Sequence, residues 1–200
     1  MRVLLLATTN QHKINEYRTI FSAIPFQLHS LRDFQIGADV EETGSTFTEN
    51  AELKALAYAE MSGQLSLADD SGLEIDALNG APGIYSARFA GREATYEERF
   101  RLILEQLKDV AVAQRTARFV CAITIAEPSG YHRTVEGVIE GIIADAPRGE
   151  NGFGYDPIFF VPELGKTTAE LSPEQKNRIS HRGRAAQLAA ALLNDWPDGQ

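Results

Sequence analysis

The chain has 200 residues, a formal net charge of −9 and one cysteine, which suits a single compact domain without disulfide bonds. The negative charge argues against a protein that mainly binds nucleic acid, because such proteins carry a basic face. The N-terminal apolar run, Val3 to Ala7, is too short for a signal peptide or a membrane span. We therefore expect a cytoplasmic protein with no nucleic-acid or membrane partner.

Short apolar runs alternate with helical patterns along the first third of the chain. Apolar residues three and four apart indicate helices, and unbroken apolar runs of about five residues indicate buried strands. A capping-box pattern from Thr46 to Glu49 opens the longest of these helices, and Gly63 ends it. The predicted elements are a strand over residues 2–7, a helix up to Ile24, a strand over 26–31, a helix over 46–61 and a strand over 65–68.

The rest of the chain predicts a long strand pair, one short strand and three helices. A second capping-box pattern, Thr95 to Glu98, opens a helix, and Pro173 after Ser172 opens another. A turn at Pro128 joins the long strands. The predicted elements are a helix from 95 to about 108, strands over 117–127, 132–144 and 157–161, and helices from 172 and over 182–194.

This order of elements predicts an α/β fold with a mixed sheet, bent or split into two lobes. Two adjacent carboxylates, Asp69 and Asp70, are expected where the 65–68 strand ends. Carboxylates at such a position can bind a hard cation such as Mg²⁺ or accept a proton from water. Asn50 and Lys54 are four residues apart and share a helix face. They could orient a carboxylate or a phosphate if that face lines a cleft, or be ordinary surface residues if it does not.

Four other polar segments have both a functional and a purely structural interpretation. Thr8–Lys13 could bind phosphate at a helix N-terminus or only cap the helix. Glu41-Glu42 could supply a metal ligand or be a solvated pair. Asn151–Pro157 could present an aromatic ring to a base or plug a turn. Ser180–Arg184 could bind a carbonyl or phosphate or form a basic edge. The chain has no Walker A loop, zinc-type Cys/His spacing or GxSxG elbow.

In combination, these segments resemble the inosine triphosphate pyrophosphatase-like family, which comprises the non-canonical purine nucleoside triphosphate pyrophosphatases (XTP/dITP diphosphatases). The resemblance covers nearly the whole chain and rests on five segments in order. They read TTNQHKINE, EETGSTFTENAELKA, ADDSGLEIDALNGAPGIYSARFAG, FGYDPIFF and SHRGRA.

The resemblance implies a homodimer whose subunit, residues 1–200, is one nucleotide pyrophosphatase domain. It implies an elongated, curved mixed β-sheet flanked by helices, with two lobes and a central cleft. The implied activity is Mg²⁺-dependent hydrolysis of ITP, dITP and XTP to the monophosphate and pyrophosphate, which cleanses the nucleotide pool. The implied partner is a small-molecule nucleoside triphosphate.

By position, the resemblance implies that Asp70 is the proton acceptor and a metal ligand, and that Glu42 is the second metal carboxylate. Lys13 and Lys54 are expected to offset developing charge, and Asp69 is a second candidate for the roles of Asp70. Thr9 departs from relatives that often have glycine or serine there. The substrate-binding residues implied are Thr8, Thr9, Asn10, Gln11, His12, Lys13, Ser71, Phe153, Gly154, Tyr155, Asp156, Lys176, His181 and Arg182.

Two other functions remain open at this point. One is a nucleotide-binding sensor without turnover, against which Glu42, the two aspartates and the two lysines argue. The other is a pyrophosphatase of the Maf type, against which the FGYD and SHR segments argue.

A site lined by hydrogen-bond donors would favour bases with an O6 acceptor over adenine, whose N6 is a donor.

Overall fold

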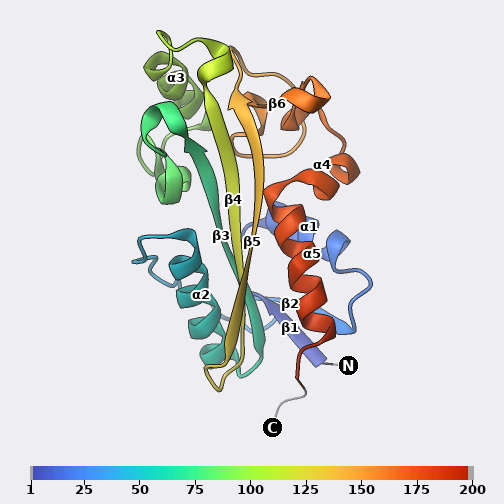
Figure 1. Ribbon diagram of the computed structural model, residues 1–200. Helices are drawn as coiled ribbons and strands as arrows, with labels where there is room; N and C mark the ends of the chain where they lie inside the picture. The colour runs from blue at the N-terminus through green and yellow to red at the C-terminus, as the bar shows by residue number, and fades with distance from the viewer. Residues whose placement is uncertain (1, 198–200) are drawn as a thin grey trace. The chain divides into compact units, whose positions relative to one another are not determined.

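A computed structural model describes residues 2–197, in which one seven-stranded sheet is flanked by helices (Figure 1). The strand order is β2-β1-β3-β4-β5-β6-β7. The strands are β1 (Arg2–Leu6), β2 (Phe26–Ser30), β3 (Leu65–Ile75), β4 (Thr116–Ala126), β5 (His132–Ile143), β6 (Phe159–Val161) and β7 (Lys166–Thr167). The α-helices are α1 (Gln11–Ile20), α2 (Phe47–Ser62), α3 (Tyr96–Gln106), α4 (Pro173–Ile179) and α5 (His181–Asn194).

The sheet is mixed, which confirms the predicted α/β class. Strand β1 pairs in parallel with β2 and β3, whereas β6 pairs antiparallel with β5 and β7. The chain divides into two compact units. Within the described residues, unit 1 comprises 2–70, 121–137 and 182–197, and unit 2 comprises 71–120 and 138–181.

Unit 1 has helices on both faces of its part of the sheet (Figure 1). Side chains of a strand point alternately to opposite faces. Leu4 and Leu6 of β1 accordingly pack with α1 and α5, whereas Leu5 packs with α2. The same alternation continues along β3, where Leu67 joins the first cluster and Ala68 the second. Each residue of β3 is therefore assigned to one face by its place in the sequence.

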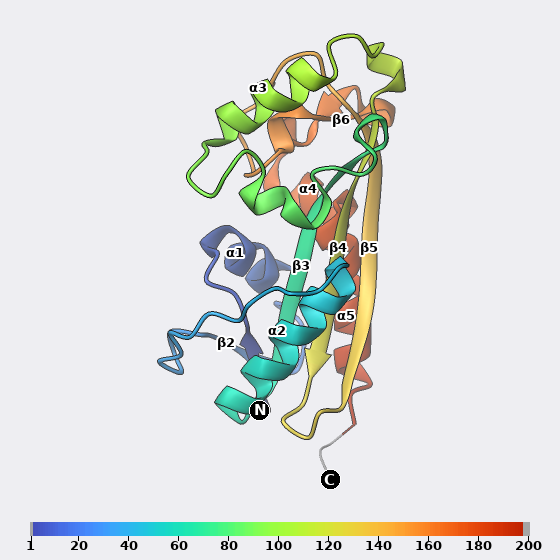
Figure 2. The ribbon, with the colours of Figure 1, turned by 90° about the vertical axis from the view of Figure 1, so that its left-hand side faces the viewer.

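Unit 2 has a separate hydrophobic core beneath α3 (Figure 2). Phe100 and Ile103 of α3 pack with Phe159 of β6 and with Tyr155 just before it. The ring of Tyr155 meets Tyr96 edge to face, with centroids 5.4 Å apart. This core fixes the segment before β6, which carries several of the predicted substrate-binding residues.

The prediction that the third strand ends at Ala68 was wrong. Strand β3 continues to Ile75, so Asp69 and Asp70 lie inside it rather than at its end. Buried carboxylates usually argue against a strand interior, because an uncompensated buried charge is costly. Here each carboxylate has a cationic side chain beside it, and this compensation allows the strand to continue.

Helix starts agree largely with the predicted caps. The reciprocal capping box of Thr95 and Glu98 is present. At α2 only half of the predicted box forms: Thr46 Oγ1 accepts from Glu49 N–H, but the Glu49 carboxylate accepts instead from the backbone N–H and hydroxyl of Ser45. No helix within residues 2–197 is long and apolar enough to cross a membrane.

We expect the core of unit 2 to respond strongly to truncation at Leu107, which is fully buried. Leu107→Ala should lower the free energy of unfolding by about 2–5 kcal/mol, because it removes buried methyl groups and leaves a cavity. The matched control is Leu164→Ala in the same unit, where the leucine is 46 % exposed, and its loss should stay below about 1 kcal/mol. Urea unfolding monitored by circular dichroism would measure both, and equal losses would contradict this description of the core.

Candidate active site

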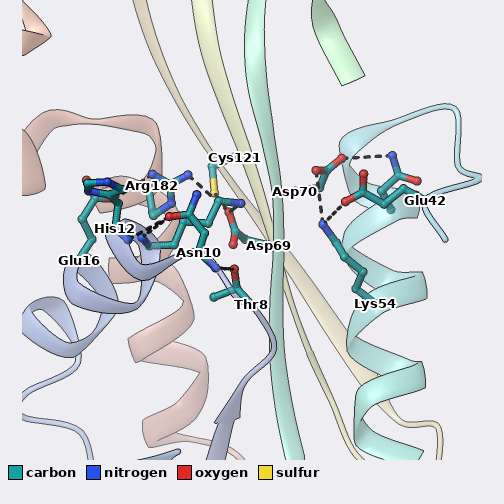
Figure 3. A network of polar contacts seen from close by, with 12 residues as sticks. Thr8, Asn10, His12, Glu16, Glu42, Lys54, Asp69, Asp70, Cys121 and Arg182 are labelled. Atoms are coloured by element: carbon teal, nitrogen blue, oxygen red, sulfur yellow. Dashed lines mark hydrogen bonds and ion pairs between the residues drawn. The ribbon is translucent and has the colours of Figure 1, made fainter. Parts of the chain in front are cut away.

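Asp69 lies among buried charges on the face of β3 that packs against α1 and α5 (Figure 3). Lys13 Nζ is 2.8 Å from its carboxylate, and Arg182 Nη2 is 3.6 Å from it. Arg182 Nη1 also pairs with Glu16, at 2.8 Å. Burial alone would raise the pKa of Asp69, but Lys13 and Arg182 outweigh it and lower that pKa. Asp69 is therefore an ionised anchor for two cations and a poor proton acceptor.

Asp70 points to the opposite face of β3, toward α2 (Figure 3). Lys54 Nζ lies 3.5 Å from the Asp70 carboxylate and 2.6 Å from that of Glu42. The amide of Asn50 donates to the other Asp70 oxygen at 3.2 Å. Burial raises the pKa of Asp70, and Glu42 adds to this effect while Lys54 opposes it. The structure thus brings together three predicted residues: Glu42, Lys54 and Asp70.

The pKa of Lys54 is raised even though it is largely buried. Burial alone would lower this pKa, because the charged ammonium loses its hydration. The nearby carboxylates, with Asp70 contributing most, outweigh that cost. Lys54 is therefore charged, and its ammonium joins Glu42 to Asp70.

The predicted phosphate loop between β1 and α1 is ordered by its own side chains. Asn10 caps α1, and its Oδ1 accepts from the backbone N–H groups of His12 and Lys13, at 2.9 and 3.3 Å. Thr8 Oγ1 accepts from Asn10 N–H at 3.2 Å. Asn10 thereby satisfies two of the N–H groups that were expected to attract an anion. Of the other side chains in this loop, Thr9, Gln11 and His12 are exposed.

The predicted base-binding segment in unit 2 is built around a buried carboxylate. Asp156, only 2 % exposed, accepts from Lys176 Nζ at 2.6 Å, from Phe153 N–H at 2.8 Å and from Thr168 Oγ1 at 2.9 Å. Lys176 Nζ lies 4.6 Å from the centroid of the Phe153 ring. Asp156 therefore positions Lys176 against this ring from inside the protein, rather than facing a ligand itself.

Glycine is required beside this carboxylate. Gly152 has a φ of +75°, which side chains with a Cβ rarely adopt. A Cβ at this position would also overlap the Asp156 carboxylate and approach Lys176 Nζ to 3.2 Å. The glycine-rich pattern before β6 therefore serves the close approach of backbone to an ion pair.

The other predicted residues of unit 2 differ in exposure. Tyr155 is buried and donates its hydroxyl to the carbonyl of Ser86 at 2.8 Å. His181 is also buried, and its ring stacks on Phe119 with centroids 4.6 Å apart. Ser71 is partly exposed in β3. Tyr155 therefore supports the segment from the core.

The donor set around Asp70 fits a magnesium ion. Glu42 and Asp70, which both pair with Lys54, are carboxylates. Mg²⁺ prefers oxygen ligands of this kind. Within residues 2–197, no group of three or more His, Cys, Asp and Glu side chains is placed to hold a metal ion. Such a cage is not required, since Mg²⁺ usually takes one or two carboxylates and completes its shell with water and substrate phosphates.

Sequence reasoning missed two supporting residues, Glu16 and Thr168, which pair with Arg182 and Asp156. No spacing rule connects residues 16 and 182, because their contact is created by the packing of α1 and α5. Asn50 was not among the predicted site residues, although its position four residues before Lys54 suggested that both could orient a carboxylate or a phosphate. That spacing is the signal that could have identified it, since both side chains reach Asp70.

Comparisons with known proteins identify the family of this chain. A family model described as the Ham1 family matches residues 4–192. A dITP/XTP pyrophosphatase of Exiguobacterium sp. is 52% identical over 98% of this chain and 99% of its own, and one of Desulforamulus reducens is 51% identical over 96% and 95%. The structure of a HAM1 protein from Coxiella burnetii is 44% identical, covers 98% of this chain and 100% of its own, and superposes with a TM-score of 0.90. A match over nearly the full length, in both sequence and fold, shows that this chain belongs to the Ham1 family.

Proposed function

We propose that this chain hydrolyses the non-canonical purine nucleoside triphosphates ITP, dITP and XTP to the monophosphate and pyrophosphate, and so cleanses the nucleotide pool. The observation that carries the proposal is the cluster of Glu42, Lys54 and Asp70 on one face of β3. The similar proteins of Exiguobacterium and Desulforamulus, named dITP/XTP pyrophosphatases, support the same substrate class.

Glu42 and Asp70 would hold Mg²⁺, which neutralises charge on the phosphate oxygens when bound. Burial raises the pKa of Asp70, and we propose that Asp70 also accepts the proton of the attacking water. The reaction adds one water across the anhydride bond between the α- and β-phosphates. Lys54 supplies a fixed positive charge beside these carboxylates, suited to offset negative charge that develops during cleavage.

On the other face of β3, we propose that Lys13 and Arg182 bind the phosphates and the purine carbonyl. Asp69 would hold both cations in place. Support for this division comes from the lowered pKa of Asp69, which makes it unsuited to proton transfer. Thr8 and Asn10 order the preceding loop. The role of Asp69 thus becomes electrostatic support rather than a substitute for Asp70.

Besides Arg182, several residues of unit 2 are proposed to select the base. Phe153 is partly exposed and lies against Lys176, and an aromatic ring of this kind stacks on a base with a gain of about 1–3 kcal/mol. Donors such as Lys176 and His181 would pair with the O6 of inosine or xanthine and would be mismatched with the N6 of adenine. Asp70 and Ser71 are consecutive in the sequence, as are His181 and Arg182.

We further propose that the two units act as one nucleotide pyrophosphatase domain, that the protein is a homodimer and that it works in the cytoplasm. The consecutive binding residues support a single domain. A single, fully buried cysteine is consistent with a reducing compartment. Size-exclusion chromatography with light scattering would test the dimer.

The substrate proposal predicts a specific activity pattern. Pyrophosphate release from ITP, dITP and XTP should exceed release from ATP by at least about 100-fold in kcat/KM, because adenine leaves donors in the site without acceptors. GTP belongs in the same panel, since it also carries O6. Removal of divalent cations with EDTA should abolish release, and added Mg²⁺ should restore it. Equal rates on ATP would contradict the specificity, and tight nucleotide binding without turnover would indicate a sensor.

The two neighbouring aspartates should respond oppositely to the same substitution. Asp69→Asn should lower the free energy of unfolding at pH 7 by about 3 kcal/mol, because it leaves Lys13 without its anion and buried Arg182 with Glu16 alone. Asp70→Asn should leave stability unchanged or raise it, because burial disfavours the ionised carboxylate. Asp70→Asn should nevertheless reduce kcat on ITP by at least about 100-fold, since a metal ligand and proton acceptor is lost. Urea unfolding and pyrophosphate release would measure both effects.

The pH dependence of the stability loss in Asp69→Asn tests whether that loss comes from the missing charge. A carboxylate whose folded-state pKa lies below its ordinary 3.8 stabilises the protein above that value and loses this contribution as the pH falls through the folded pKa. The stability deficit of Asp69→Asn should therefore be full at pH 7 and shrink in acid. A deficit that is the same at pH 7 and pH 3 would point to lost packing rather than lost charge.

A further inference from the structure

We infer that Asn50 is a positioning residue that sets Glu42 and Asp70 in place before any metal binds. The inference rests on the proposed function, in which these two carboxylates form the metal site. Asn50 touches neither substrate nor metal in this proposal. It acts through hydrogen bonds to the two parts of the protein that carry the ligands.

The side chain of Asn50 uses both ends of its amide. Its Nδ2 donates to Asp70 Oδ2 at 3.2 Å, and its Oδ1 accepts from the backbone N–H of Gly44 at 2.8 Å. Gly44 is two residues after Glu42 in the same loop. One fully buried side chain therefore connects the strand that carries Asp70 with the loop that carries Glu42.

Besides the Lys54–Glu42 ion pair and the hydrogen bonds of Ser45 to Glu49, α2 binds the loop that carries Glu42 through Tyr58 and Asn50, one on each side of this residue. Before it, the Tyr58 hydroxyl donates to the carbonyl of Ala38 at 3.1 Å. After it, Gly44 donates to Asn50. Tyr58 and Asn50 both bind the loop, but of these two side chains Asn50 also contacts Asp70. Comparing variants of the two therefore separates an effect on the loop alone from an effect on the positions of both Glu42 and Asp70.

The contact between Gly44 and Asn50 leaves no space for adjustment. A Cβ at Gly44 would lie 2.7 Å from Asn50 Oδ1 and 2.7 Å from Glu49 Cβ. Both neighbours belong to the first turns of α2, which is capped and packed in the core. The loop is therefore seated directly on the helix, and its distance from Asp70 is set by the length of one asparagine side chain.

An amide is the side chain that meets both requirements. A carboxylate at position 50 would accept from Gly44 but repel Asp70, and an apolar residue would remove the hydrogen bonds of Gly44 N–H and Asp70 Oδ2 to this side chain. Partners that orient metal ligands in this way typically change metal affinity by about 10–100-fold when they are removed. We expect an effect of that size for Asn50.

The test is Mn²⁺ binding to the protein without nucleotide, measured by electron paramagnetic resonance. Asn50→Ala should raise the Kd for Mn²⁺ by about 10–100-fold relative to wild type. In the ITP assay it should raise the Mg²⁺ concentration for half-maximal rate by a similar factor, and excess Mg²⁺ should restore kcat to within about threefold. Restoration by metal would distinguish misplaced ligands from a damaged fold, because an excess of cation repairs only the former.

The matched control is Tyr58→Phe, which removes the hydrogen bond to the loop on the other side of Glu42 and should leave the Kd for Mn²⁺ within about threefold of wild type. Gly44→Ala keeps the Asn50 side chain but displaces the loop from it, and should weaken Mn²⁺ binding in the same direction as Asn50→Ala. This variant covers the case in which Asn50→Ala fails to fold.

Three results would overturn the inference: wild-type affinity in Asn50→Ala, equal weakening by Tyr58→Phe, or no Mn²⁺ binding by the wild type without nucleotide. None of these by itself rejects the proposed function, which is decided by Mg²⁺-dependent pyrophosphate release from ITP. An inactive wild-type enzyme would reject the proposed function, and the two failures are therefore distinguishable.

Discussion

The site depends on one constraint, the alternation of side chains along β3. Consecutive residues of a strand face opposite sides of the sheet, so the neighbouring carboxylates of Asp69 and Asp70 enter different surroundings (Figure 3). One meets Lys13 and Arg182 and has a lowered pKa, and the other meets Lys54 and has a raised pKa. Two chemically identical, consecutive residues thereby acquire opposite pKa shifts.

Much of the fold follows from local patterns, whereas the site depends on long-range contacts. Apolar runs and caps predicted the helices and most strands, because these signals act within a few residues. The extent of β3 could not be predicted, because the compensation of its buried charges comes from Lys13 and Lys54 on separate helices. The clustering of Glu42 with Lys54 and Asp70 was expected from a resemblance, whereas the pairing of Arg182 with Glu16 was not expected.

Carboxylates in this protein serve as internal counter-ions at two of the predicted binding segments. Asp156 pairs with Lys176 in unit 2, and Asp69 pairs with Lys13 in unit 1. A cation needs such a partner to be placed at a buried position, because its desolvation is otherwise too costly. A residue at a predicted ligand-binding position can thus act indirectly. It holds in place a cation that is itself suited to bind an anionic or polar group.

The register of β3 against β1 has a consequence for errors in folding. Leu65 and Leu67 are paired with Leu4 and Leu6, and these side chains share one cluster. A slip of one residue would reverse every side chain of β3, placing Asp69 beside Lys54 and Asp70 beside Lys13. The sheet would still carry both acids, but with their surroundings exchanged. The leucines therefore do more than fill the core: in the slipped register they would be forced against α2, where the small side chain of Ala68 now packs. This overpacking disfavours the slip and so protects the identity of each carboxylate.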